Sequence, residues 1–281
     1  MKHHNRSILF SGDLGRLHDP VMYPPAIVQS TDYLVLESTY GNRLHEAINP
    51  IDQLSEVINK TAKRGGSVII PAFAVGRAQS ILYFIYQLKK ANKIPDIPVF
   101  LDSPMAISAT KTFCHYTNEH KLSKQQCFDI CAGATYINTV EESKAIDNYQ
   151  YPIIIISASG MATGGRVHHM KQFAQDYRNT ILFTGYQVGG TRGARMVNGE
   201  SEVKIHGHMI PIRAEVIELS NTSAHADYQE ILAWLKKFTK PPVKIFITHD
   251  EPEAAQSLKN TIEKELAWKC NIPLYLQTEE L

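Results

Sequence analysis

The sequence lacks an excess of charge of either sign. Lysine and arginine together number 29, and aspartate and glutamate 28, so the 281 residues carry a formal net charge of +1. A nearly neutral chain has little long-range attraction for nucleic acid, because that attraction grows with net positive charge. Any binding of an anion must therefore depend on a local arrangement of donors.

Cysteine is also scarce. The four cysteines include no CxxC pair, and the two closest, Cys127 and Cys131, are separated by three residues. This spacing does not match the usual zinc or redox motifs. It indicates small thiols that pack as apolar groups.

Long apolar runs are missing as well. The first six residues, MKHHNR, are polar, and the apolar stretch after them covers residues 8–10, which is not the pattern of a signal peptide. Runs such as residues 153–156 fall far short of the roughly 20 apolar residues that a membrane helix needs. We therefore expect a cytoplasmic protein with no membrane partner. Since 43% of the residues are apolar, we also expect it to be globular with a real core.

The common nucleotide-binding motifs do not occur. The sequence contains neither GxxxxGK[ST] nor GxGxxG, which weighs against the nucleotide-binding folds that use them. It also has no internal repeat, low-complexity tract or obvious linker. A second domain would therefore have to be inserted with short junctions, and residues 42–50 and 220–222 are the candidates.

Short β-branched runs alternate with helical patterns along the chain, which favours an α/β fold with buried strands. Apolar residues at helical spacing predict helices at 76–92, 226–238 and 251–267. We expect strands at residues 7–10, 33–37, 67–72, 98–102, 153–158, 180–184, 214–219, 243–248 and 273–276.

Three glycine-rich turns follow predicted strands, at residues 71–77, 157–166 and 184–193, and each contains an arginine. Backbone N–H groups at helix starts attract anions, and glycine lets a ligand approach the backbone closely. Three such turns favour a surface that binds several phosphates, and therefore a polymer. Alternatively, the glycines could serve turn geometry alone. The candidate phosphate-binding residues are Arg77, Ser157, Ser159, Gly160, Gly164, Arg166, Gln187 and Arg192.

Two carboxylates and two histidines lie where predicted strands end or helices begin. Asp13 and Glu37 each follow an apolar strand, His249 follows another, and His225 precedes a helix. Aspartate and imidazole at strand ends are the ligands of a dinuclear zinc hydrolase. Each residue alone could equally be a surface carboxylate or a capping histidine.

Other histidines give weaker signals. The HGH sequence at 206–208 lacks the following Asp-His of a metal motif. His168 and His169 are adjacent in a predicted helix, where neighbouring side chains diverge, so we expect at most one to face a site. His45 gives no sign of a role.

Six motifs together resemble the β-CASP branch of the metallo-β-lactamase fold. They are SGDLGR at 11–16, LESTYG at 36–41, PAFAVGR at 71–77, SASGM at 157–161, SAHADY at 223–228 and HDEP at 249–252. The resemblance implies an incomplete metallo-β-lactamase αββα domain with an inserted β-CASP α/β domain. Residues 1–48 and 220–281 would belong to the former and 49–219 to the latter.

By this resemblance Asp13 would bridge two zinc ions, and His249 would bind one of them. His225 is similar to the histidine that protonates the leaving oxygen, and Glu37 to the acidic residue that orients it. The resemblance therefore implies a zinc-dependent ribonuclease in RNA processing or decay, with RNA as its partner. A catalytically inactive RNA-binding or scaffold subunit is the alternative, and a thioester or lactam hydrolase is a weaker one.

Departures from the family pattern bear on activity. Family members carry an HxHxDH sequence upstream of the bridging aspartate, but twelve residues precede Asp13 here and do not contain it. Asp250 stands where relatives have glycine, and His208 where an acidic residue is common. We expect the C-terminal part of a nuclease, as a fragment, a broken gene or half of a split protein. A second chain or a missing N-terminal segment would complete the metal site, and a homodimer is a separate expectation.

Overall fold

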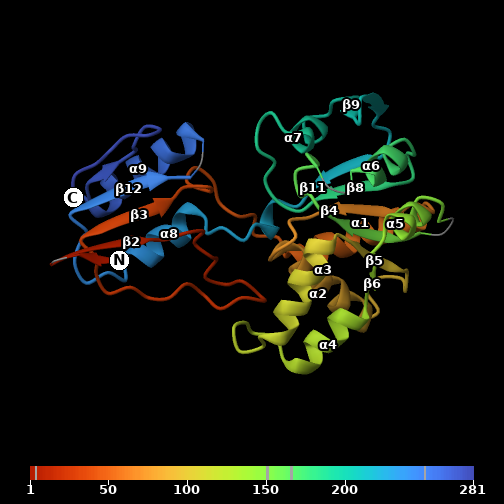
Figure 1. The fold of residues 1–281 in the computed structure, drawn as a ribbon, viewed down its shortest axis with the longest axis horizontal. Helices are drawn as coiled ribbons and strands as arrows, with labels where there is room; N and C mark the ends of the chain where they lie inside the picture. The colour runs from red at the N-terminus through yellow and green to blue at the C-terminus, as the bar shows by residue number, and fades with distance from the viewer. Residues whose placement is uncertain (4, 150–151, 165–166, 250) are drawn as a thin grey trace. The chain divides into compact units, whose positions relative to one another are not determined.

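Two units make up the chain in the computed structural model, which describes residues 1–3, 5–149, 152–164, 167–249 and 251–281. Unit 1 comprises Met1–His45 and Ala224–Leu281, and unit 2 comprises Glu46–Ser223. Figure 1 shows both units, each built on its own sheet. Within the described residues, no helix combines the length and apolar character that a membrane span requires.

Unit 1 contains a five-stranded sheet with the order β1-β2-β3-β12-β13. β1 pairs antiparallel with β2, whereas the other neighbours are parallel. Glu37 ends β3 and is opposite Thr248, the last residue of β12, so both strands deliver their carboxyl ends to the same edge. The strands are β1 Lys2–His3, β2 Arg6–Phe10, β3 Tyr33–Glu37, β12 Lys244–Thr248 and β13 Cys270–Asn271.

One face of this sheet forms the core of unit 1. Leu34, Leu36 and Ile247 point to that face, where they pack with apolar residues of α8 (Tyr228–Leu235) and α9 (Pro252–Leu266). Asp227 begins α8, because its carboxylate accepts hydrogen bonds from two N–H groups of the first turn. The opposite face carries Phe10, whose side chain is 54% exposed.

Unit 2 contains a six-stranded sheet, and all of its strands are parallel. Their order is β11-β8-β4-β7-β5-β6. β4, β7 and β8 are therefore neighbours, although they are far apart in sequence. The strands are β4 Val68–Pro71, β5 Val99–Asp102, β6 Thr135–Tyr136, β7 Ile154–Ser157, β8 Thr180–Phe183 and β11 Glu215–Glu218.

Helices connect these strands, and α2, α3 and α4 lie together on one side of unit 2 (Figure 1). A separate hairpin joins β9 (Glu202–Ile205) to β10 (His208–Pro211). The helices are α1 Pro50–Lys63, α2 Arg77–Lys90, α3 Pro104–His115, α4 Lys124–Ala132, α5 Val140–Ile146, α6 His168–Phe173 and α7 Arg192–Val197, followed by the short 3-10 helix η1 Ser220–Thr222.

The expected strands are confirmed with shifts of at most one residue at either end, except the last. Residues 273–276 do not form a strand, and the pairing with β12 is made by Cys270 and Asn271 instead. Pro273 explains the difference, because proline has no N–H to donate to a sheet. The three expected helices correspond to α2, α8 and α9.

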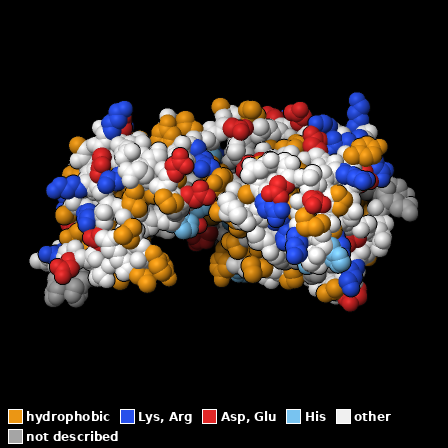
Figure 2. Space-filling view, turned by 90° about the horizontal axis from the view of Figure 1, so that it is seen from above, with side chains coloured by type: hydrophobic (Ala, Val, Ile, Leu, Met, Phe, Trp, Pro, Cys, Tyr) orange, Lys and Arg blue, Asp and Glu red, His pale blue; other side chains and the backbone are white. Residues whose placement is uncertain are grey.

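Charge on the surface is mixed. On the face shown in Figure 2, basic and acidic side chains are interspersed, and neither sign gathers into one broad patch. This agrees with the formal net charge of +1. Recognition of a polyanion must therefore come from particular loops.

Candidate functional site

Glu37 is a buried carboxylate at the end of β3, with a side chain that is 2% exposed. Its Oε1 accepts a hydrogen bond from the backbone N–H of Leu14. Its Oε2 accepts one from the Thr39 hydroxyl at 2.6 Å and one from His225 Nδ1 at 2.8 Å. These three donors stabilise the ionised carboxylate, because a buried charge is tolerated only where it is hydrogen-bonded.

The loop that carries His225 is anchored to unit 1 through its backbone. Ala226 N donates to Leu14 O at 2.7 Å, and Gly15 and His225 form an antiparallel bridge. Behind this loop, His45 Nε2 lies 2.8 Å from the His225 carbonyl oxygen. Burial, aided by the charge of Arg16, lowers the pKa of His45. A neutral His45 thus donates its Nε2 proton to that carbonyl and fixes the loop.

The contact between Glu37 and His225 sets the protonation of the imidazole ring. A carboxylate can only accept, so His225 must carry a proton on Nδ1. In the neutral ring Nε2 is then the acceptor nitrogen, and in the charged ring it is a donor. This pair therefore has the chemistry of a general acid held by a carboxylate.

Asp13 and His249 form a second, exposed pair beside the first. Asp13 Oδ1 lies 3.8 Å from His249 Nδ1, and the two side chains are 69% and 62% exposed. The His249 ring centroid is 6.2 Å from that of His225. The structure thus brings together all four side chains that the sequence singled out at strand ends and helix starts.

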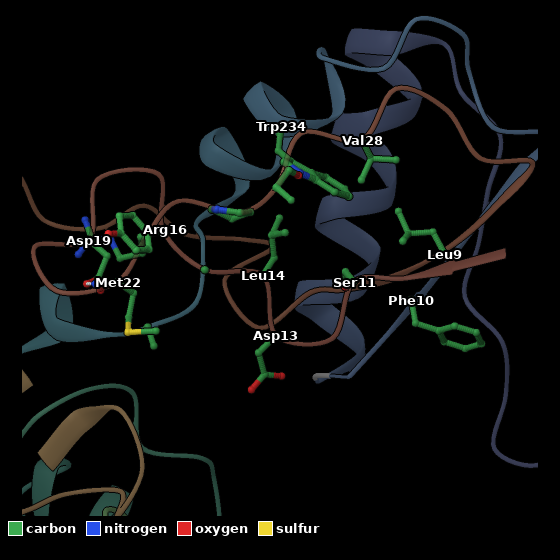
Figure 3. A pocket seen from close by; sticks show the side chains of 15 residues that line it. Leu9, Phe10, Ser11, Asp13, Leu14, Arg16, Asp19, Met22, Val28 and Trp234 are labelled. Atoms are coloured by element: carbon green, nitrogen blue, oxygen red, sulfur yellow. Dashed lines mark hydrogen bonds between the residues drawn. The ribbon is translucent and has the colours of Figure 1, made fainter. Parts of the chain in front are cut away.

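A pocket of about 420 Å³ adjoins Asp13 on unit 1. Leu9, Leu14, Val28 and Trp234 line its apolar part, and the carboxylate of Asp13, whose side chain is 69% exposed, points away from them (Figure 3). The carboxylate is therefore free of apolar cover on that side. This orientation suits a group that binds a cation or a ligand.

Asp13 and His249 meet part of what a zinc ion requires. A carboxylate oxygen and an imidazole nitrogen 3.8 Å apart can bind one ion together, since each bond would be about 2.1 Å. Within the described residues, however, no third His, Cys, Asp or Glu joins these two as a set of metal donors. Zinc in proteins takes about four ligands. The described residues thus supply only part of a zinc site.

The three glycine-rich turns follow β4, β7 and β8, which are adjacent strands of unit 2. Because the strands are parallel, their carboxyl ends meet at one edge, where ligands of open α/β sheets usually bind. Gly160 is required there, since a Cβ at this position would lie 2.9 Å from the Phe73 ring. At Gly193 a Cβ would lie 1.9 Å from Gln187 Oε1, so a larger residue would displace the Gln187 side chain.

Several of the predicted phosphate-binding side chains hold these turns to one another. Arg77 is buried and donates to the Thr184 carbonyl and to Thr222 Oγ1. The side-chain amide of Gln187 donates to the carbonyl of Gly160, at 3.2 Å, and to that of Gly185. These contacts give both side chains a positioning role, which the sequence did not reveal.

Two of the remaining predicted phosphate-binding residues, Arg192 and Ser159, also make hydrogen bonds to the backbone. Arg192 donates to the carbonyls of Ala162 and Lys204, whereas Ser159 Oγ accepts from the N–H of Gly164 at 3.2 Å. Ser157 ends β7 and is buried. Arg166 and Asp250 lie outside the described residues.

A buried charged cluster in unit 2 was not anticipated. His169 is fully buried, with Nε2 2.7 Å from Asp102 and Nδ1 2.7 Å from Asp147. Burial opposes its charge, but hydrogen bonds to the two carboxylates outweigh that effect and raise the pKa of His169. His168 Nε2 lies 2.9 Å from Ser143, which also donates to Asp102. The two adjacent rings thus do not diverge, since the ligand atoms of Asp102, His168 and His169 lie within 4.8 Å of one another; that at most one of these histidines faces a functional site stays a prediction.

The HGH sequence, His206 to His208, forms the tip of the β9–β10 hairpin. His206 and Gly207 have φ angles of +48° and +84°, as a tight two-residue turn requires. This local sequence thus serves turn geometry.

Two family models match this chain. One, described as the Beta-Casp domain, matches residues 78–196 within unit 2. The other, described as the Zn-dependent metallo-hydrolase RNA specificity domain, matches residues 209–273. The second match includes His225 and His249.

Curated relatives are similar over almost the whole chain. Ribonuclease TTHA0252 of Thermus thermophilus is 36% identical over 90% of this chain and 59% of its own length. The RNase J-like protein of Methanocaldococcus jannaschii is 33% identical over 96% of this chain and 64% of its own length. The transcription termination factor FttA of Methanosarcina mazei is 30% identical over 98% of this chain and 46% of its own length.

This chain thus spans less than two thirds of the length of each of these relatives. Both family models and all three relatives agree with the motifs and with the α/β architecture. The chain belongs to the β-CASP branch of the metallo-β-lactamase fold.

Proposed function

We propose that this chain is part of a zinc-dependent ribonuclease that hydrolyses RNA phosphodiester bonds in RNA processing or decay. The observation that carries the proposal is the pairing of His225 with buried Glu37 at 2.8 Å, beside exposed Asp13 and His249. The first pair can deliver a proton, and the second offers donors to a cation. A metal-dependent hydrolase that cleaves phosphodiesters uses both functions.

Each residue has a defined task in this proposal. Asp13 and His249 bind zinc together with ligands from elsewhere. Glu37 holds the His225 ring so that Nε2 presents a proton to the oxygen that leaves phosphorus. Zinc, when bound, supplies an activated water and offsets charge on the phosphoryl oxygens.

RNA is the proposed substrate because of the names of the relatives and the arrangement of unit 2. Two similar proteins are named as a ribonuclease and an RNase J-like protein. In unit 2, three glycine-rich turns meet at the carboxyl edge of β4, β7 and β8. Backbone N–H groups there would bind RNA phosphates, and Arg77, Gln187 and Arg192 would keep the turns in place.

The remaining zinc ligands would come from another segment, a second chain or a homodimer partner. Unit 1 supports this idea, since its sheet exposes an apolar side chain, Phe10, on the face opposite α8 and α9. Tyr33 and Val35 lie on that same face and are partly exposed. A cytoplasmic location stays a prediction.

The proposal is tested by RNA cleavage with the matched variants His225→Ala and His208→Ala. His208 lies in the exposed hairpin, so its loss serves as the control. With zinc present, we expect His225→Ala to slow cleavage of single-stranded RNA about 10²- to 10⁴-fold. RNA affinity should stay the same, because His225 acts on the leaving oxygen. Equal rates for the two variants would rule out the role assigned to His225.

A second candidate is an RNA-binding subunit without activity of its own. It is favoured by the incomplete donor set, since the described residues add no third ligand to Asp13 and His249. Filter binding that persists in chelator, without cleavage at any zinc concentration, would support this candidate. Loss of cleavage on chelation and its recovery with zinc would support the nuclease.

A further inference from the structure

Two cysteines on neighbouring helices of unit 2 form a close pair that the proposed ribonuclease does not use. Cys114 lies near the end of α3 and Cys131 near the end of α4. Their sulfur atoms are 2.7 Å apart. That distance is far below an ordinary non-bonded contact and not far above the roughly 2.05 Å of a disulfide bond. Only a small displacement separates these two thiols from a bond.

The surroundings make one of the two sulfurs nucleophilic. The Cys114 and Cys131 sulfurs share a hydrogen bond in which either thiol can donate, and this contact outweighs burial and lowers the pKa of Cys131 to about 6. The same interaction raises the pKa of Cys114, so the pair shares one proton. Cys131 is therefore the more acidic and more nucleophilic of the two thiols. Both residues are partly exposed, so a small oxidant can reach them.

The other two cysteines have raised pKa values. Cys127 is 2% exposed, and burial raises its pKa. Burial likewise raises the pKa of Cys270, to about 12. Cys270 also belongs to unit 1, whereas Cys114 and Cys131 belong to unit 2. Both therefore serve as matched controls.

We propose that Cys131 and Cys114 are a peroxide-reactive pair that forms a reversible disulfide between α3 and α4. The Cys131 thiolate attacks one oxygen of a hydroperoxide, the O–O bond breaks, and hydroxide or alkoxide leaves. Cys131 becomes a sulfenic acid, oxidised by two electrons as the peroxide is reduced. The Cys114 sulfur then attacks the Cys131 sulfur, and the S–O bond breaks. Water leaves with the Cys114 proton.

A metal site is the main competing use of these thiols, because His120 lies nearby. His120 Nε2 is 3.0 Å from the Phe113 carbonyl, and His120 Nδ1 accepts from Leu122 N at 3.2 Å. Both ring nitrogens are therefore occupied by backbone groups. Within the described residues, the cysteines also do not form a set of three donors within 4.8 Å of one another. The geometry thus favours a bond between two sulfurs.

The test uses the reduced 281-residue chain, stoichiometric hydrogen peroxide, and alkylation of the remaining thiols under denaturing conditions. Peptide mass mapping should show a Cys114–Cys131 disulfide within one chain, reversed by dithiothreitol. The variants Cys127→Ser and Cys270→Ser should form it as readily as the parent chain. At pH 7, Cys131 should react more than about tenfold faster than Cys270, because far more of it is thiolate.

Two further variants separate the chemical steps. In Cys114→Ser, Cys131 should accumulate as a sulfenic acid that dimedone traps, since its resolving thiol is missing. In Cys131→Ser, Cys114 should stay reduced. Serine differs from cysteine by one atom, and circular dichroism is the check that both variants fold. The proposal is overturned if Cys114 and Cys131 stay alkylatable after peroxide. It is also overturned if the disulfide uses Cys127, joins two chains, or is blocked by zinc that copurifies.

Discussion

Replacement of Glu37 by glutamine is the sharpest perturbation of the candidate site. Glutamine has the same shape as glutamate, but one of its two terminal atoms donates instead of accepting. Glu37 accepts hydrogen bonds from Leu14 N, Thr39 Oγ1 and His225 Nδ1. Its replacement therefore changes the bonding of His225 without creating a cavity.

The expected loss of stability follows from those three bonds. If the amide oxygen faces Leu14 N, that hydrogen bond remains, but its acceptor is now neutral. A hydrogen bond to a charged acceptor stabilises a protein by about 1 kcal/mol more than one to a neutral acceptor. The Thr39 hydroxyl can rotate to accept from the amide. The bond from His225 Nδ1 must be reorganised, at a further cost of about 1 kcal/mol. We expect Glu37→Gln to lower the free energy of unfolding by about 2 kcal/mol.

The change should also alter the imidazole tautomer. A glutamine amide that faces His225 Nδ1 requires that nitrogen to accept, so the neutral ring would carry its proton on Nε2. A wrong tautomer of this kind slows a serine protease about 10⁴-fold. We expect RNA cleavage to fall by about 10²- to 10⁴-fold, because the amide cannot stabilise the imidazolium form of His225, and a neutral imidazole is a far weaker acid for the leaving oxygen.

Urea unfolding and ¹⁵N NMR of the histidine side chains measure the two effects separately. Glu265→Gln is the matched control, because Glu265 is exposed on α9. A Glu37→Gln variant with unchanged stability and with the proton still on Nδ1 of His225 would refute this reasoning.

Three other predictions concern unit 2 and its pH and redox behaviour. Because the pKa of His169 is raised, its stabilising effect should be complete below about pH 6.5 and be lost as pH rises through the raised value. Urea unfolding across pH should show that the free energy of unfolding falls less with rising pH in Asp147→Asn than in the exposed control Asp96→Asn. Gly193→Ala should cost about 1 to 3 kcal/mol in the same assay, since its Cβ would meet Gln187. Thermal unfolding should show that the α3–α4 disulfide stabilises unit 2 by about 3 kcal/mol, and no difference between oxidised and reduced chains would contradict this.

Much of the fold could be predicted because the strands are strongly apolar. The residue run 153–156 is isoleucine throughout and became β7, and residues 33–37 became β3 without a shift. Three residues of the candidate site, Asp13, Glu37 and His249, were predictable for a related reason, whereas His225 was indicated by the helix start that follows it. Polar residues directly after such strands must lie at sheet edges, and parallel strands place their ends together.

The rest depends on tertiary contacts that no local pattern encodes. His45 gave no signal, yet it is buried and donates to the His225 carbonyl. Arg77 looked like a phosphate ligand, but the burial of its guanidinium required carbonyl partners. The tight pair of Cys114 and Cys131 arises from the packing of α3 on α4. Spacing along the sequence cannot show these contacts.

Zinc titration by calorimetry tests the central claim most directly, namely that Asp13 and His249 form the metal-binding edge of the site. The account predicts that this chain binds zinc weakly, that Asp13→Ala and His249→Ala each weaken binding further, and that His208→Ala does not. Zinc that binds the double variant of Asp13 and His249 as well as it binds the parent chain would contradict the account.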